Sequence, residues 1–140
     1  MAQVSVTTEL PVPADSVWQT IGRFGGLPDW HPAIESCEVK REGGDTLRTL
    51  HLVGGGTIVE KLESSDDKER SYSYSIMSGP LPVADYTGTI RLREAGDGKG
   101  CTIEWSSDFK ASGAPENEAV AAIRGIYEAG FENLKRMFGA

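Results

Sequence analysis

The sequence has few residues of the kinds that form metal centres, redox sites or disulfide frameworks. Its 140 residues include two histidines and two cysteines. Cys37 and Cys101 lie far apart and form no Cys-x-x-Cys motif, and neither His31 nor His51 has a second ligand at metal-binding spacing. We therefore expect no disulfide and no metal site. The lack of a flavin or dinucleotide fingerprint likewise predicts no cofactor.

Positive charge and long apolar runs are also scarce. Lys and Arg number 14 against 21 Asp and Glu, a net charge of −7, so we expect no nucleic-acid partner that must be held through phosphates. No apolar stretch approaches the roughly 20 residues of a membrane-spanning helix. Residues 1–13 contain no Lys or Arg and no apolar block typical of a signal peptide, and we expect a cytoplasmic protein.

Length and composition predict one domain over residues 1–140. Hydrophobic residues make up 39% of the chain and charged residues 25%, as is typical of a globular protein. No internal repeat, low-complexity segment or linker divides the sequence.

Alternating apolar and polar residues predict seven strands. Gln3–Leu10 alternates in this way, and six further strand-like runs follow between Ile34 and Lys110. Their hairpin-length gaps, rich in Gly, Pro and Asp, indicate antiparallel neighbours. Ser71–Met77 and Cys101–Phe109 carry large apolar side chains on one face only, which favours a sheet with one solvated face.

Helical patterns occur at two places. After Pro13, a short amphipathic helix is predicted up to Gly22, and the glycines and prolines of residues 25–32 leave room for at most one more helical turn. A long helix is predicted from about Pro115 to Phe138, with acidic residues in its first turn and basic residues in its last. Its apolar stripe should lie on the sheet and consists of Val120, Ile123, Tyr127, Phe131, Leu134 and Met137.

This order of elements resembles the START-like or Bet v 1-like (SRPBCC) superfamily, and within it the bacterial polyketide cyclase/dehydrase-like proteins. The segments that carry the resemblance are Pro13–Trp18, Leu27–Pro32, Val59–Leu62, Gly79–Pro82, Trp105 and the terminal helix. The resemblance implies an α+β helix-grip fold. In that fold a curved seven-stranded antiparallel sheet wraps around the long C-terminal helix, two short helices follow the first strand, and a ligand cavity lies between sheet and helix.

Glu60 is the charged residue with the strongest functional signal. It shares strand parity with Ile58 and Leu62, so it faces inward if they do, whereas the opposite register turns Val59 and Lys61 inward. The resemblance places an acidic residue here. An inward carboxylate has a raised pKa and suits a ligand hydrogen bond or a general base. On this basis, Glu60→Gln should change ligand binding and hardly affect stability.

Both histidines are further candidates for acid–base chemistry or ligand contact, because either can titrate near neutral pH. The alternative for His31 and His51 is an exposed or hydrogen-bonded imidazole with no chemical role. Trp30 precedes His31 in a loop, where it either fills the core or lies at the cavity mouth.

Aromatic side chains with polar tips suit both core packing and the binding of a ring-bearing ligand. Together with residues of the terminal helix they complete the predicted ligand-binding set: Trp30, His31, Glu60, Tyr72, Tyr74, Tyr86, Trp105, Phe109, Val120, Ile123 and Tyr127.

Three functions are compatible with these patterns. The first is binding of a small hydrophobic molecule, aromatic, polyketide-like or lipid-like, between sheet and helix. The second is a cofactor-free cyclase, aromatase or dehydratase that uses Glu60, His31 or His51 for proton transfer; no Ser-His-Asp or Cys-His pattern supports a nucleophilic mechanism. The third is a regulatory or chaperone-like protein-interaction domain, for which the acidic charge and the loop near Trp30 are the only indications.

Overall fold

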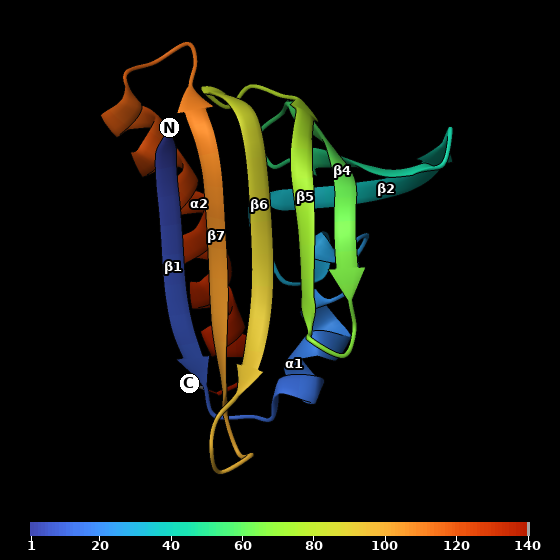
Figure 1. The fold of residues 1–140 in the computed structure, drawn as a ribbon, viewed down its shortest axis with the longest axis vertical. Helices are drawn as coiled ribbons and strands as arrows, with labels where there is room; N and C mark the ends of the chain where they lie inside the picture. Colours follow the sequence, from blue (N-terminus) through green and yellow to red (C-terminus); the bar gives the residue numbers. More distant parts are fainter. Residues whose placement is uncertain (140) are drawn as a thin grey trace.

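A computed structural model describes residues 1–139 as a curved sheet, one long helix and two short helical segments (Figure 1). Residue 140 of the predicted domain lies outside the described residues. The elements, in chain order, are β1 (Ala2–Leu10), α1 (Ala14–Ile21), the 3-10 turn η1 (Leu27–Asp29), β2 (Ile34–Glu42), β3 (Asp45–Leu52), β4 (Thr57–Asp66), β5 (Ser71–Ser78), β6 (Val83–Glu94), β7 (Cys101–Ala111) and α2 (Glu116–Met137).

The sheet confirms the predicted helix-grip architecture. Its seven strands are all antiparallel and follow the order β1-β7-β6-β5-β4-β3-β2. Strands β2 to β7 therefore form a continuous meander, and the first strand closes the edge beside the last. The second of the two predicted short helices is the single turn η1, because the surrounding glycines and prolines allow no longer one.

The core lies between the inner face of the sheet and α2. The helix packs on β1 and β7, at one side of the sheet (Figure 1). The predicted stripe on α2 is largely buried, with Ile123, Tyr127 and Leu134 at most 1% exposed. Met137 differs because it lies in the last helical turn, where it is 45% exposed. No helix among residues 1–139 is long and apolar enough to span a membrane.

Two glycines of α2 have different surroundings. A Cβ atom on Gly130 would lie 2.8 Å from His31 Cδ2 and 2.9 Å from Trp30 Cζ3, closer than carbon atoms pack. Gly130 therefore allows the helix to contact the loop after η1. Gly125 is exposed, and a Cβ atom there would meet no other atom within 4 Å.

These surroundings predict opposite effects for two matched substitutions. Gly130→Ala should lower the free energy of unfolding by about 1–3 kcal/mol, because the added methyl group overpacks the contact with Trp30 and His31. Gly125→Ala should raise it by about 0.5–1 kcal/mol, because alanine loses less backbone entropy in a helix. Chemical denaturation of both variants measures these free energies. Equal effects at the two positions would contradict the close packing of Gly130 against Trp30 and His31.

Candidate functional site

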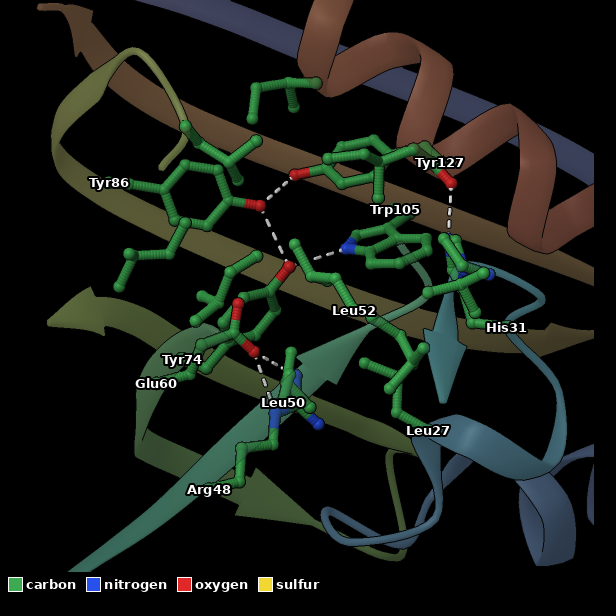
Figure 2. A pocket seen from close by; sticks show the side chains of 18 residues that line it. Leu27, His31, Arg48, Leu50, Leu52, Glu60, Tyr74, Tyr86, Trp105 and Tyr127 are labelled. Atoms are coloured by element: carbon green, nitrogen blue, oxygen red, sulfur yellow. Dashed lines mark hydrogen bonds and ion pairs between the residues drawn. The ribbon is translucent and has the colours of Figure 1, made fainter. Parts of the chain in front are cut away.

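A cavity of about 280 Å³ lies between the inner face of the sheet and α2 (Figure 2). Its apolar wall is formed by Leu27, Ala33, Ile34, Leu50, Leu52, Val53, Ile58, Ile76, Leu81, Ile123 and Ile126. Its polar and aromatic wall is formed by His31, Arg48, Glu60, Tyr74, Tyr86, Trp105 and Tyr127. The cavity exists because α2 rests on β1 and β7, whereas β3 and β4 lie on the other side of the curved sheet.

The rim of the cavity is apolar. Val53, at the start of the β3–β4 turn, is 63% exposed, and Ala33 is exposed after η1. Leu81, in the β5–β6 connection, and Ile126, on α2, are half-buried. The mouth therefore opens where these four segments meet.

An ion pair between Arg48 and Glu60 lies in the cavity wall. The two residues are opposite one another on β3 and β4, and both side chains face inward. Arg48 Nε donates to Glu60 Oε1 over 2.8 Å, and Arg48 Nη2 lies 2.7 Å from the same oxygen. Arg48 is 1% exposed and Glu60 5% exposed, so the charges neutralise each other away from bulk water. Glu60 thus has the inward orientation that its parity with Ile58 indicates.

Arg48 is also enclosed by rings and a carbonyl group. Its guanidinium carbon lies 4.1 Å from the centroid of Phe24 and 5.0 Å from that of Tyr74, distances at which cations interact favourably with aromatic faces. Nη1 donates to the carbonyl oxygen of Phe24 over 2.8 Å. These contacts hold the guanidinium against the wall.

The surroundings shift the pKa values of both partners. Burial raises the pKa of the Glu60 carboxyl, and the charge and hydrogen bonds of Arg48 only partly oppose this effect. For Arg48, burial favours the neutral form, but the interactions with Tyr72 and Glu60 outweigh it and leave the pKa above its ordinary value. Arg48 therefore remains a cation.

A chain of hydrogen bonds links three tyrosines across the cavity (Figure 2). The hydroxyls of Tyr74 and Tyr86 lie 2.9 Å apart, and the Tyr86 hydroxyl is bonded in turn to that of Tyr127. Trp105 Nε1 donates to the Tyr74 hydroxyl over 2.9 Å. Gly88 makes room for this cluster, because a Cβ atom there would lie 2.7 Å from the Tyr74 hydroxyl.

All three tyrosines stay protonated. Burial raises the pKa of Tyr74 and Tyr86 well above the ordinary value and raises the pKa of Tyr127 to about 12. Each hydroxyl therefore keeps a hydrogen that it can donate.

His31 is held by the backbone on both sides of its ring. Ala33 N donates to Nδ1 over 3.1 Å, and Nε2 lies 2.7 Å from the carbonyl oxygen of Ile126. Because a carbonyl oxygen can only accept, these partners require a neutral imidazole with its proton on Nε2. Burial lowers the pKa of His31, and the bond to Ile126 opposes this shift only in part. The imidazole therefore joins η1 to α2 and has no free nitrogen for proton transfer.

The structure brings together seven residues of the predicted ligand-binding set at the cavity: His31, Glu60, Tyr74, Tyr86, Trp105, Ile123 and Tyr127. It places His51 elsewhere. His51 faces the outer side of β3, because its strand parity is opposite to that of Arg48, and its Nε2 lies 2.6 Å from the exposed Glu38 carboxylate. This position separates His51 from the cavity.

Four further residues of that set lie behind the cavity wall or beside it. Trp30 is 1% exposed and packs against Trp105 with ring centroids 5.5 Å apart, so it fills the core. Tyr72 lies behind Arg48, with its ring edge-on to Phe24, and Phe109 stacks on Tyr86. Val120 packs against the hydrophobic core.

Arg48 is a residue of the site that the sequence patterns did not single out. Its signal is present in the hairpin: Arg48 and Glu60 are each six residues from Gly54, at the tight turn where Gly54, Gly55 and Gly56 have positive φ angles of 88°, 107° and 99°. Such a turn places opposite charges across from each other, and Arg48 shares parity with the apolar Leu50. Among residues 1–139, no group of three or more His, Cys, Asp or Glu side chains could hold a metal ion.

A protein-family profile described as "Polyketide cyclase / dehydrase and lipid transport" matches residues 1–139. The chain belongs to this family. The match covers the cavity and all its polar residues, and it confirms the resemblance to START-like, Bet v 1-like proteins.

Known proteins resemble this chain in structure or in sequence. The protein XoxI from Bacillus cereus is 40% identical, with a TM-score of 0.93 over 99% of this chain and 96% of that one. The ZhuI aromatase/cyclase from Streptomyces sp. R1128 is 21% identical, with a TM-score of 0.73 over 97% and 95% of the two chains. The abscisic acid receptor PYL2 of Arabidopsis thaliana is 26% identical over 94 residues, which are 64% of this chain. That match spans about half the length of PYL2.

The buried ion pair changes the expectation for substitutions at its two members. Arg48→Met should lower the free energy of unfolding by about 3–5 kcal/mol, because it leaves the Glu60 carboxylate buried without a cation. Glu60→Gln should also destabilise the protein, contrary to what the sequence indicates, because Arg48 then lacks its counter-charge. Denaturant titration measures both effects.

A matched control is the exposed pair Arg23–Asp29, whose side chains are 68% and 57% exposed. Arg23→Met should cost at most about 1 kcal/mol, because surface ion pairs contribute little. A loss from Arg48→Met as small as that from Arg23→Met would contradict the role given to the buried pair.

The lowered pKa of His31 leads us to expect that the stability of the protein depends on pH. Because its pKa in the folded protein lies below the ordinary value of 6.5, the unfolded chain takes up a proton there first as the pH falls. The stabilisation is complete above about pH 6.5 and decreases by up to about 1.4 kcal/mol per pH unit below it. The difference in unfolding free energy between wild type and His31→Gln, followed from pH 7.5 to 5, isolates this term.

Titration of the imidazole by NMR gives an independent check. In a His51→Gln variant, His31 is the remaining histidine, so its ring signals are unambiguous. They should report a neutral ring with the proton on Nε2 at pH 6.5. A ring that is half protonated at or above that pH would contradict the geometry.

Proposed function

We propose that this protein binds a small, largely apolar molecule in the cavity between the sheet and α2. The observation that carries the proposal is the combination of an apolar wall with a few converging polar groups, Glu60 and the tyrosine chain, in a space shielded from solvent. Ligand pockets in proteins have this composition, because apolar contact supplies affinity and a few polar groups supply orientation.

The aromatic residues provide flat contact surfaces. Trp105 and Tyr127 stack with ring centroids 4.2 Å apart and planes inclined by 17°, and their hydrogen bonds keep the side chains in fixed positions. A preorganised wall reduces the entropy that binding must overcome.

Binding is favoured over acid–base catalysis by the state of the two histidines. Both nitrogens of His31 are engaged with the backbone, and His51 lies outside the cavity. His31 and Glu60 both line the cavity. Of the predicted acid–base candidates there, only Glu60 has a polar atom, Oε2, with which no described residue forms a hydrogen bond. The likeness to ZhuI, at 21% identity, concerns the fold. PYL2 is named a receptor of abscisic acid, which is consistent with a binding role for the shared segment.

Naphthalene is a suitable first probe for the cavity. In protein labelled with 15N at tryptophan, titration with naphthalene should shift the indole N–H signal of Trp105, which lines the cavity. The signal of Trp18, whose indole donates to Asp67 at the surface, should stay in place and serves as the internal reference.

Two variants of α2 control for the site. Ile123→Trp fills part of the cavity and should weaken naphthalene binding by at least about tenfold, whereas Ala121→Trp, on the exposed side of the helix, should leave it unchanged. Circular dichroism establishes that both are folded. Equal binding by the two variants, or no shift of Trp105 with any probe, would overturn the proposed function.

A further inference from the structure

Charge in the cavity wall is balanced before any ligand enters. Among the described lining residues, Arg48 and Glu60 carry the formal charges, and His31 is held neutral by its partners. Arg48 directs two N–H groups to Glu60 and another to the Phe24 carbonyl, and rings lie on its guanidinium. A carboxylate in the cavity would therefore meet a cation that is already satisfied and a carboxylate that repels it.

Glu60 nevertheless retains one free acceptor. Both contacts with Arg48 use Oε1, and no described residue donates to Oε2. Figure 2 shows that this second oxygen points away from Arg48. Among the described residues, the buried side-chain atoms without a hydrogen-bond partner are Trp30 Nε1 and Ser107 Oγ. Glu60 Oε2 is not one of them: it is open to the cavity, where a ligand group that brings a hydrogen can donate to it.

The tyrosine chain has one more hydroxyl hydrogen than its own links use. Tyr74, Tyr86 and Tyr127 have three hydroxyl hydrogens and two hydroxyl–hydroxyl links, and Trp105 supplies the further hydrogen bond at Tyr74. One hydroxyl hydrogen is therefore left over, whichever direction the chain runs. When the chain runs towards Tyr127, the buried and otherwise unpaired Ser107 hydroxyl can accept this hydrogen. The polar group that the cavity offers to a ligand is therefore the free acceptor of Glu60, to which a neutral hydroxyl group can donate.

The volume of the cavity sets the scale of the molecule. A dry protein cavity of about 150 Å³ holds one benzene molecule, in an engineered protein unrelated to this one. The cavity here measures about 280 Å³, so a molecule of about two fused rings fits.

We infer that the cavity selects neutral molecules that carry a hydroxyl group, which donates to Glu60 Oε2, and excludes carboxylates of the same size. The inference rests on the proposed function, since it concerns the same cavity. It adds the chemical class of the ligand and names Glu60 as the residue that recognises the hydroxyl group.

Four probes with the same ring system test this inference: naphthalene, 2-naphthol, 2-methoxynaphthalene and 2-naphthoate. At pH 7 the phenol is neutral and the carboxylate ionised. Calorimetric titration of the wild-type protein should show 2-naphthol binding at least about tenfold more tightly than 2-methoxynaphthalene, which accepts a hydrogen bond but cannot donate one. 2-Naphthoate should bind more weakly than naphthalene.

Glu60→Gln tests the residue that makes the distinction. With Arg48 no longer neutralised, 2-naphthoate should gain at least about tenfold in affinity over its wild-type value, and the preference for 2-naphthol over 2-methoxynaphthalene should fall below about threefold. Lys61→Gln, on the outer face of the same strand, is the matched control and should retain the wild-type order. If Glu60→Gln does not fold, the wild-type order of the four probes still decides the question.

The outcomes separate the two proposals. Naphthalene and 2-methoxynaphthalene binding as tightly as 2-naphthol, or 2-naphthoate binding as tightly as 2-naphthol, would overturn the inference and leave the proposed cavity binding intact. No binding of any probe, with an unmoved Trp105 signal, would overturn both. The predicted order in the wild type, together with the predicted gain in 2-naphthoate affinity in Glu60→Gln, would support both.

Discussion

The constraint on which the site depends is the mismatch between a straight helix and a curved sheet. α2 lies against β1 and β7, and the sheet continues through β6, β5 and β4 to the far edge at β2 (Figure 1). A straight element cannot follow that curve, so close packing on one side leaves space on the other. Gly130 secures the close side by allowing the helix to contact Trp30 and His31. The cavity is thus a consequence of where the helix is held.

Polar groups inside this space are paired almost completely, and the pairing decides what each can do. His31 has a neutral ring whose nitrogens are both occupied, so its place beside the cavity does not make it a base. Arg48 is saturated by Glu60, a carbonyl oxygen and aromatic rings, so it supplies no free positive charge. What remains for a ligand is the second oxygen of Glu60. A residue's chemistry here follows from the partners it already has, more than from its type.

Much of the fold could be predicted because it follows from local patterns. Alternation and short turns indicate the antiparallel strands, and the proline, charge pattern and apolar stripe of Glu116–Met137 indicate the long helix. Parity with Ile58 offers the inward orientation of Glu60 as one of two registers, and the structure has that one. Arg48 escaped notice because a charged residue on a strand is ordinarily solvated, and its burial depends on the carboxylate across the β3–β4 hairpin.

The placement of Trp30, Tyr72 and Phe109 could not be obtained in the same way. All three are buried aromatic residues, as their patterns indicate, but whether a buried ring lines a cavity or stands behind it depends on neighbours from other elements. Trp105 and Arg48 occupy the positions in front of Trp30 and Tyr72, and Tyr86 has Phe109 stacked on it.

The sequence by itself determined the order of strands along the chain, the long helix and the family, because these depend on periodicity and short-range geometry. It left two registers open for Glu60, and the tertiary structure decided between them by turning Glu60 inward. The tertiary structure alone decided that Glu60 is neutralised by Arg48, that His31 is neutral and that three tyrosines form one hydrogen-bonded chain. Those properties arise from distances between residues far apart in the chain, which packing sets and periodicity does not encode.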